Sequence, residues 1–344
     1  MKPRGHRSSR PRKLVLALAG LAAFAAADAA GAMASAVTVS NKNRVNVTTS
    51  GNERNDFVIS YDAVADAYFV ADASGINANG TCTQFDADTA ICPGTNIGSV
   101  TVNAGAAADT ILLSSGLLPT IEADLDGGSG DDKIVGGPAA DAIDGDSGND
   151  QLDGGLGADD LRGGANTDLV SYASRFTGVT VTIGLTDDND GNELDQTGLR
   201  RDTVRGDVEQ LVGGQSGDLI FGDESGETLA GGPGPDRIFG QDGNDAIDGG
   251  FGDDFLSGSN GGDTIIGGPD QDQLLGGSDN DVLSGSGGND RLIGKKGFDA
   301  LNGKEGSDRL FAKDGGRDKK INCGSGVGEG ATRDKRFDPR AKSC

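Results

Sequence analysis

The sequence is dominated by a nine-residue repeat, and residues 213–311 divide into eleven consecutive copies of it. Five further copies in one frame cover residues 127–171. In all sixteen copies the first position is Gly, the sixth is acidic and the eighth is Ile, Leu or Val. Fixed columns at so short a period predict a solenoid, because one unit cannot bury its single aliphatic residue alone.

Each unit divides into a turn and a short strand. Glycines at the first, and often the second and fourth, positions predict a turn, because Gly permits positive φ and close backbone approach. The last three residues alternate polar, aliphatic and polar, which is typical of a strand with one inward side chain. Stacked coils would place the acidic sixth residues about 4.8 Å apart. Unpaired carboxylates at that spacing repel one another, so we expect cations between the turns.

Carboxylates and turn carbonyls are hard oxygen ligands, and their number and flexible geometry favour Ca²⁺ over Mg²⁺ or softer metals. We therefore expect several Ca²⁺ ions bound by the acidic sixth residues. In the first set of copies these are Asp132, Asp141, Asp150, Asp159 and Asp168. In the second set they are Asp218, Glu227, Asp236, Asp245, Asp254, Asp263, Asp272, Asp281, Asp290, Asp299 and Asp308. A worn copy at residues 104–112 adds Asp109 to the same column.

The unit GGxGxDxUx, as in GGPGPDRIF at residues 231–239, resembles the hemolysin-type (RTX) calcium-binding repeat. The resemblance implies an all-β parallel β-roll in which two units make one eighteen-residue turn and each ion lies between units two apart. Alternate acidic residues would then line opposite edges of the roll. Lys295, Lys296 and Lys304 stand in the turns of the last two copies, and we expect weaker binding there.

The N-terminus predicts a secretory signal peptide over residues 1–36. Residues 1–13 are basic, residues 14–27 are apolar, and small residues follow. A retained membrane anchor is the alternative, although the apolar run is too short to span a bilayer and Asp28 interrupts it. We expect a secreted, extracellular protein, associated with the cell surface in one variant of this hypothesis, with no membrane span in the mature chain.

Charge sets further limits. The chain has a net charge of −24, and residues 1–36 carry six basic residues and one acidic residue, so the mature chain is near −29. Such self-repulsion predicts that calcium binding and folding are one event, and it excludes nucleic acid as a partner. The partners we expect are calcium ions and a cell-surface or matrix polymer, with the protein itself a monomer.

The one histidine, His6, lies in the predicted signal peptide, so His-based catalysis and His-ligated zinc are excluded from the mature chain. We predict no enzyme activity. The leading hypothesis is an exported calcium-binding repeat protein with a structural or surface role. The alternative is an adhesin or matrix-binding protein that uses the N-terminal region or the insertion between the arrays. An enzyme acting on extracellular polysaccharide and a cytolysin-related protein are less favoured.

Outside the arrays, residues 37–103 predict a β-rich capping domain, with an adhesive domain as the rival. Short strands are expected at residues 37–39, 45–47, 57–60, 68–70 and 99–102. In an exported protein, Cys82 and Cys92 favour a disulfide that closes a small loop. The first array is predicted at residues 104–171 and the second at 213–311.

Between the arrays, residues 172–212 break the nine-residue frame, and we expect a protruding flap, with a peripheral cation site in its acidic loop as an open alternative. Residues 312–344 are basic and predict a C-terminal cap, as similar repeat proteins have, tied by a Cys323–Cys344 bridge. Four cysteines permit three pairings, and an electrostatic anchor to an anionic polymer or membrane is the alternative role for this segment.

Overall fold

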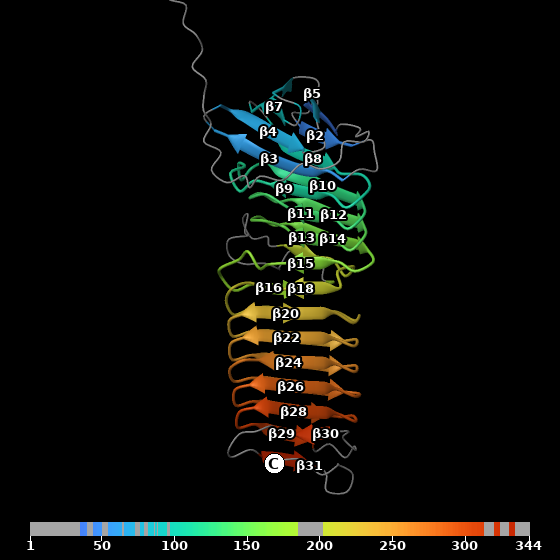
Figure 1. Cartoon of the computed structure of the whole chain (residues 1–344), viewed down its shortest axis with the longest axis vertical. Coiled ribbons are helices and arrows are strands. Elements are labelled where there is room, and N and C mark those ends of the chain that lie inside the picture. Colours follow the sequence, from blue (N-terminus) through green and yellow to red (C-terminus); the bar gives the residue numbers. More distant parts are fainter. Residues whose placement is uncertain are drawn as a thin grey trace, which may run out of the picture. The chain divides into compact units, whose positions relative to one another are not determined.

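A computed structural model describes residues 35–39, 44–49, 54–63, 65–72, 76–78, 82–85, 87, 89–94, 97–184, 202–312, 320–323 and 330–333. In these residues the regular structure is all β and falls into three sheets (Figure 1). The expected all-β roll with parallel stacking is confirmed. Residues 1–34 of the predicted signal peptide lie outside the described residues. Strand β1 begins at Ser35, so a signal peptide ending at residue 36 would cut into that strand.

The long sheet is shared by both arrays. In spatial order it contains β30 (Lys320–Asn322), β28 (Ala300–Glu305), β26 (Val282–Gly287), β24 (Thr264–Gly268), β22 (Ala246–Phe251), β20 (Thr228–Pro233), β18 (Gln210–Val212), β15 (Leu169–Ser171), β13 (Gln151–Asp153), β11 (Lys133–Val135), β9 (Thr110–Leu113), β3 (Asp56–Asp62), β4 (Ala67–Asp72), β7 (Thr89–Pro93) and β6 (Thr83–Gln84).

Two shorter sheets share the opposite side. The N-terminal sheet contains β17 (Thr203–Val204), β14 (Asp160–Ala165), β12 (Ala142–Ser147), β10 (Glu122–Ser129), β8 (Ser99–Asn103), β2 (Arg44–Thr48), β1 (Ser35–Val39) and β5 (Ile76–Ala78). The C-terminal sheet contains β16 (Thr180–Thr182), β19 (Leu219–Phe221), β21 (Arg237–Asp242), β23 (Phe255–Asn260), β25 (Gln273–Ser278), β27 (Arg291–Lys295), β29 (Arg309–Ala312) and β31 (Gly330–Arg333).

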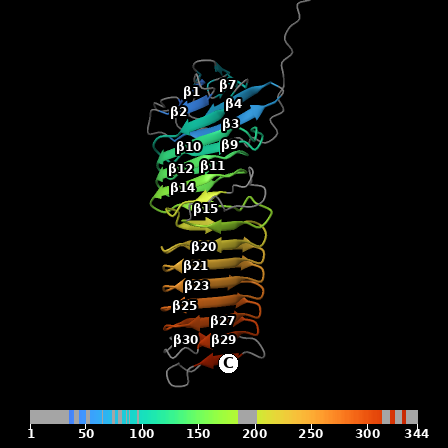
Figure 2. The ribbon, with the colours of Figure 1, turned by 180° about the vertical axis from the view of Figure 1, so that it is seen from behind.

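The register between neighbouring strands is eighteen residues in the second array. Leu229 pairs with Ile247, and Ile247 pairs with Ile265, all in parallel strands of the long sheet. Ile238 pairs with Leu256 in the same way in the C-terminal sheet. Two nine-residue units therefore make one coil, and successive units alternate between the two sheets seen from the front and from behind (Figures 1 and 2).

The core is a double column of aliphatic side chains. Each unit turns its eighth residue inward, and Leu229, Ile238, Leu256, Ile265 and Leu274 are fully buried. Burial of each such side chain stabilises the fold by about 2 kcal/mol. Because every unit contributes only one, the stability of the roll must accumulate over many stacked coils.

The N-terminal region continues the same sheets. Strand β2 pairs in parallel with β8, and β3 pairs in parallel with β9, so the two strands form a coil that stacks on the first array. Strands β4 and β7 then extend the long sheet in antiparallel fashion, and Cys82 and Cys92 form the expected disulfide. All five predicted strands are present, whereas β5, β6 and β7 were not predicted.

The insertion does not form a separate flap in its described parts, and that prediction is wrong for them. Strand β16 pairs with β19, β17 pairs with β14, and β18 joins β15 to β20, so three short strands of the insertion belong to the roll. A bridge from Ile183 to Val204 places β16 beyond β17, although β16 comes first in sequence. The acidic loop lies in residues 185–201, outside the described residues.

The described C-terminal residues also extend the roll. Strand β30 pairs with β28, and β31 pairs with β29, each in parallel. Cys323 is buried and takes part in a disulfide, whereas its predicted partner Cys344 lies outside the described residues.

Candidate metal centres

The acidic residues form two ladders along the turn edges of the roll. The backbone N–H of Asp236 donates to Oδ1 of Asp254 at 2.8 Å, and the N–H of Asp254 donates to Oδ1 of Asp272 at 3.0 Å. The same eighteen-residue bond recurs from Asp245 to Asp263 at 2.9 Å on the opposite edge. One carboxylate oxygen of these residues is therefore satisfied by the preceding coil, which the sequence pattern did not reveal.

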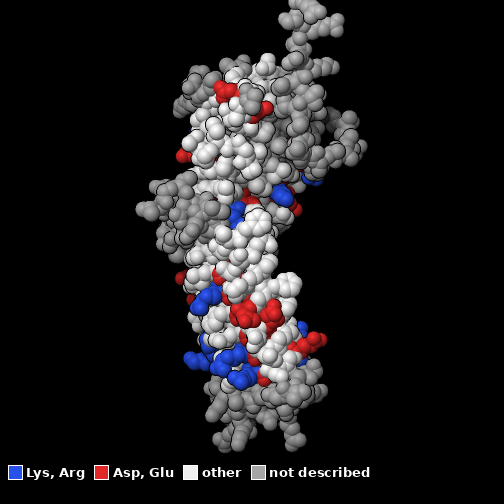
Figure 3. Space-filling model, turned by 90° about the vertical axis from the view of Figure 1, so that its left-hand side faces the viewer, with Lys and Arg blue, Asp and Glu red and all other residues white. Residues whose placement is uncertain are grey.

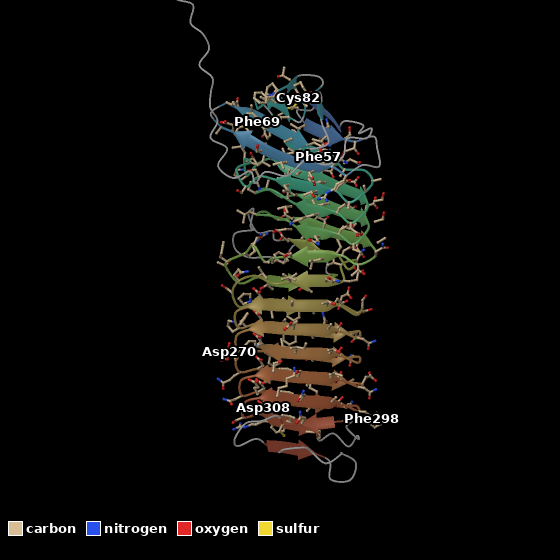
Figure 4. All side chains as sticks on the ribbon, in the orientation of Figure 1. Phe57, Phe69, Cys82, Asp270, Phe298 and Asp308 are labelled. Carbon is tan, nitrogen blue, oxygen red and sulfur yellow. A yellow bond between two sulfur atoms is a disulfide. The ribbon has the colours of Figure 1, made fainter. Side chains whose placement is uncertain are left out.

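The structure places every predicted acidic residue in one of these ladders, and all sixteen are buried. The first edge carries Asp141 and Asp159, then Asp218, Asp236, Asp254, Asp272, Asp290 and Asp308. The second edge carries Asp132, Asp150 and Asp168, then Glu227, Asp245, Asp263, Asp281 and Asp299. Asp270 and Phe298, from turns on opposite edges, are labelled on the two sides of the ribbon in Figure 4.

The second oxygen of most of these carboxylates is buried and unpaired. In Asp236, Asp254 and Asp272, Oδ2 accepts no hydrogen bond from the described residues. The same holds for Asp132, Asp150, Asp159, Asp168, Asp245, Asp263, Asp281 and Asp290. Leaving a buried acceptor unsatisfied costs about 1–3 kcal/mol, and more if it is charged, so these atoms require a partner.

Three predicted residues have a second carboxylate oxygen that accepts a hydrogen bond: Glu227, whose Oε2 accepts from the N–H of Asp223 at 3.4 Å, and Asp141 and Asp218. Oδ2 of Asp141 accepts from the N–H of Gly137 at 2.5 Å, and Oδ2 of Asp218 accepts from the N–H of Gly214 at 2.6 Å. Oδ1 of each also accepts a backbone N–H. Both of their oxygens are thus engaged within the protein, which makes them the poorest candidates for metal ligands among the sixteen.

The invariant first glycine faces this unpaired oxygen. A β-carbon on Gly249 would overlap Oδ2 of Asp254 and would lie 2.6 Å from the carbonyl oxygen of Gly267, one coil further on. A β-carbon on Gly231 would meet Oδ2 of Asp236 and the carbonyl oxygen of Gly249 in the same way. The space beside most first glycines is therefore lined by a carboxylate oxygen and a carbonyl oxygen, which are the ligands that Ca²⁺ prefers.

Positive φ is required elsewhere in the unit. None of the first-position glycines has positive φ, whereas Gly232, Gly250 and Gly268 at second positions have φ between 99° and 122°. Lys295 and Lys304 occupy the second position in the last two units and adopt φ of 67°. These units thus keep the turn shape despite their lysines, at the steric cost of a non-Gly residue in the left-handed region.

The electrostatics favour a bound cation. Burial raises the pKa of Asp254 to about 6, that of Asp236 to about 7 and that of Asp272 to about 8. Burial is the largest cause in each case, and the neighbouring carboxylates of the ladder add to it for Asp236 and Asp272. Ionising these buried carboxylates is therefore less favourable than ionising an exposed Asp, and a positive charge beside Oδ2 would offset that cost.

The candidate sites contain few side-chain ligands each. Among the described residues, no group of three or more carboxylate, imidazole or thiolate side chains converges on one point. Backbone carbonyls would therefore have to supply most of the ligands, as the carbonyl beside a first glycine such as Gly249 can. This donor set fits a hard cation that accepts many oxygens and does not fit a tetrahedral sulfur or nitrogen site.

Sequence reasoning missed two acidic members of the ladders, Asp202 and Glu209. The N–H of Asp159 donates to Oδ1 of Asp202 at 2.9 Å, and the N–H of Asp168 donates to Oε2 of Glu209 at 2.9 Å. One signal in the sequence could have identified them, because each stands two positions before a buried aliphatic residue. Asp202 precedes Val204, and Glu209 precedes Leu211. On the first edge Val179 holds the acidic position opposite Asp218, so that ladder is interrupted there.

Where the first array meets the insertion, a buried arginine provides a positive charge. The side chain of Arg175 is 6% exposed, its Nη1 lies 3.3 Å from Oδ1 of Asp153, and its Nη2 donates to the carbonyl of Gly155. Burial raises the pKa of Asp159, Asp202 raises it further, and Arg175 opposes both. The guanidinium thus contacts turn oxygens at the start of the insertion, where the regular eighteen-residue spacing between coils is interrupted.

The long sheet and the two shorter sheets opposite it, joined by acidic turns that recur every eighteen residues on each edge, define a parallel β-roll with ladders of candidate hard-oxygen sites. The RTX calcium-binding nonapeptide repeat model matches residues 124–152, 135–170, 221–256, 249–283, 257–292 and 284–316, so the chain contains RTX calcium-binding repeats in several copies. No curated protein matches the chain. Within the part of the chain that the structure describes, no helix is suited to crossing a membrane.

Proposed function

We propose that this chain is an exported protein whose roll folds around a ladder of Ca²⁺ ions, with a structural or cell-surface role. The repeats belong to a calcium-binding type. The observation that carries the placement of the ions is the buried Oδ2 of residues such as Asp254, which shares the space beside a first glycine with a carbonyl of the next coil. A bound Ca²⁺ would neutralise these buried carboxylates at neutral pH.

The proposed ligands are the carboxylates with an unpaired Oδ2, together with the turn carbonyls that face them. Asp202 and Glu209 extend the ladders into the insertion, so the row of sites on the second edge runs through both arrays. Asp141 and Asp218 are proposed as structural carboxylates that begin a ladder. The residues of this chain position and bury the oxygens, and a bound Ca²⁺ would supply the compensating charge.

Export is supported by the basic and apolar N-terminal segment and by the disulfides. The Cys82–Cys92 bridge and the disulfide at Cys323 suit an oxidising compartment. Because β1 begins at Ser35, we place the end of the removed segment before that residue. Residues 37–103 and 312–344 would then cap the open ends of the roll, since their described strands continue its sheets.

The test compares three double variants of the full chain. Asp254→Asn with Asp272→Asn should raise the calcium midpoint of folding about tenfold or more, since each removes a charge from a buried site. Asp299→Asn with Asp308→Asn should raise it less, because lysines already occupy those turns. Asp124→Asn with Asp248→Asn, on exposed strand positions, serves as the charge-matched control and should leave the midpoint unchanged. Equal midpoints for all three variants would refute the assignment.

A further inference from the structure

The outward face of the C-terminal sheet has an unusual composition. Because side chains alternate along a strand, the seventh and ninth residues of the units in β19, β21, β23, β25, β27 and β29 point outward from this sheet. None of these twelve residues is acidic, in a chain with 54 acidic residues. Three of them are arginines, namely Arg237, Arg291 and Arg309. Figure 2 shows the ribbon of this face.

The equivalent faces elsewhere carry carboxylates. In the long sheet Asp248 is exposed on the outer face, and in the N-terminal sheet Asp124, Asp144 and Asp160 lie on it. There the arginines are neutralised, since Arg162 pairs with Asp144 at 3.2 Å and Arg205 pairs with Asp160 at 2.6 Å. Arg237, Arg291 and Arg309 form no ion pair with a carboxylate among the described residues. Their donors face solvent.

Aromatic rings hold two of these guanidinium groups in place. Arg237 lies over the rings of Phe239 and Phe255, 5.8 and 5.1 Å from their centroids. Arg291 lies 4.3 Å from the centroid of Phe311. Phe239 also stacks on Phe221 at 5.0 Å. A guanidinium packed against a ring loses less conformational freedom when it binds an anion, so this face is preorganised for that purpose.

The shape of the charge pattern favours a narrow, extended anion. Arg291 and Arg309 are neighbours in adjacent strands, whereas Arg237 lies three coils before Arg291, about 14 Å away at about 4.8 Å per coil. A small anion cannot span that distance. The turn edges beside the face carry exposed carboxylates such as Asp253 and Asp270, and Figure 3 shows acidic side chains on one such edge. These would repel a broad anionic surface such as a membrane or a nucleic-acid duplex.

We propose that the outward face of the C-terminal sheet binds a linear polysaccharide that carries carboxylate groups. The arginines would form charge-assisted hydrogen bonds with the carboxylates, and the aromatic and aliphatic side chains between them would contact the C–H surfaces of the sugar rings. This inference rests on the proposed function, because the face exists only when the roll is folded. It moves the polymer-binding surface away from the N-terminal region and the insertion, where the sequence had suggested it.

The test measures binding of the full chain to hyaluronate, a carboxylated glycan, by calorimetry at saturating calcium. Dextran is the uncharged probe. Hyaluronate should bind, and its affinity should fall as the salt concentration rises. Dextran should not bind. Arg237→Gln with Arg291→Gln and Arg309→Gln should weaken binding about tenfold or more. Lys133→Gln with Lys296→Gln and Lys304→Gln changes the net charge equally, outside the C-terminal sheet, and should change binding less than about twofold.

Circular dichroism with calcium is recorded for every variant, so that failure of folding and failure of binding are separated. A wild-type chain that fails to fold with calcium would refute the proposed function. Three results would overturn the surface inference alone. They are a folded chain that does not bind hyaluronate, an equal loss of affinity in both triple variants, and preferential binding to vesicles of anionic lipid. If the triple arginine variant fails to fold, the single variants Arg237→Gln and Arg291→Gln carry the same prediction at about threefold each.

Discussion

At the scale of the residue, the first glycine of each unit is required by the space of the proposed cation site and not by the backbone conformation of the turn. None of the first-position glycines has positive φ, so the backbone there is open to other residues. What excludes a side chain is space, because a β-carbon would enter the gap between Oδ2 of the sixth residue and a carbonyl of the next coil. The invariant Gly and the invariant acid are therefore two sides of one proposed cation site.

Replacing Gly249 with Ala should impair calcium binding at Asp254. The added methyl would overlap Oδ2 of Asp254 and crowd the carbonyl of Gly267, at a cost of about 1–3 kcal/mol, which corresponds to a calcium midpoint raised about tenfold. Gly287→Ala in the same array is the control, because its β-carbon would meet only Cα of Pro269, at an ordinary contact distance of 4.0 Å. The calcium midpoint of the circular dichroism signal is the measurement. Identical midpoints for the two variants would contradict the location of the site.

Arg175 should contribute more to stability than an exposed arginine with similar geometry. Arg175→Gln removes the buried guanidinium from Asp153 and from the carbonyl of Gly155, and we expect the free energy of unfolding at saturating calcium to fall by about 3 kcal/mol. Arg162→Gln removes an exposed pair with Asp144 and should cost less than about 1 kcal/mol. Urea denaturation measures both. Equal losses would show that Arg175 is an ordinary surface ion pair.

At the scale of the element, the unit of construction is the eighteen-residue coil. Each coil adds one strand to the long sheet and one to a shorter sheet, together with two buried aliphatic residues and two acidic residues in register with their neighbours. Consecutive coils are interchangeable in shape because their turns and strands match. Interruption of the register, in contrast, affects every following residue, since a shift by one residue exchanges the inward and outward faces of a strand.

Deleting residues 231–248, one full coil, should leave a folded, calcium-dependent roll. Strand β23 would then stack on β19, with Leu256 beside Ile220 in the core. Deleting Gly249 alone should be far more damaging, because it turns the aliphatic residues of the following units out of register. Calcium-dependent circular dichroism and thermal unfolding distinguish the two. The account fails if the single deletion is tolerated better than the eighteen-residue deletion.

The sequence predicted the arrays well because each unit carries its own signals. The Gly, acidic and aliphatic columns specify the turn, the ladder and the core within nine residues, and the strands fall where those columns place them. The insertion was misread because its units lost the first glycine and because Asp202 and Glu209 are seven residues apart instead of nine. That β16 stacks beyond β17 depends on contacts between distant segments, which no local pattern encodes. The hydrogen bond from each acidic residue to the next coil was hidden for the same reason.

At the scale of the whole molecule, the feature that matters most for folding is charge. The chain carries a net charge of −24, and the acidic residues of its ladders are buried. Burying so many carboxylates is favourable only if protons or cations neutralise them. We therefore expect two routes to folding, calcium at neutral pH and protonation at acidic pH.

Acidification should partly replace calcium. The pKa of an unfolded Asp is about 3.9, whereas burial raises the pKa of Asp236 to about 7 and that of Asp272 to about 8 in the metal-free fold. These groups bind more protons when folded, so their stabilisation is fully present below about pH 4 and is lost as pH rises through about 7 to 8. Circular dichroism of the calcium-free chain should thus show more β structure at pH 5 than at pH 8. A calcium-free chain that is folded at pH 8 and unfolds on acidification would contradict this.

The most direct test is a far-UV circular dichroism titration of residues 35–344 at neutral pH, with Ca²⁺ and separately with Mg²⁺. The account predicts a largely unfolded chain without metal and a steep gain of β signal with Ca²⁺ between about micromolar and millimolar concentrations, with little response to Mg²⁺. A full β signal in the calcium-free chain, unchanged by added Ca²⁺, would show that the buried carboxylates are stabilised without a cation and would contradict the central claim.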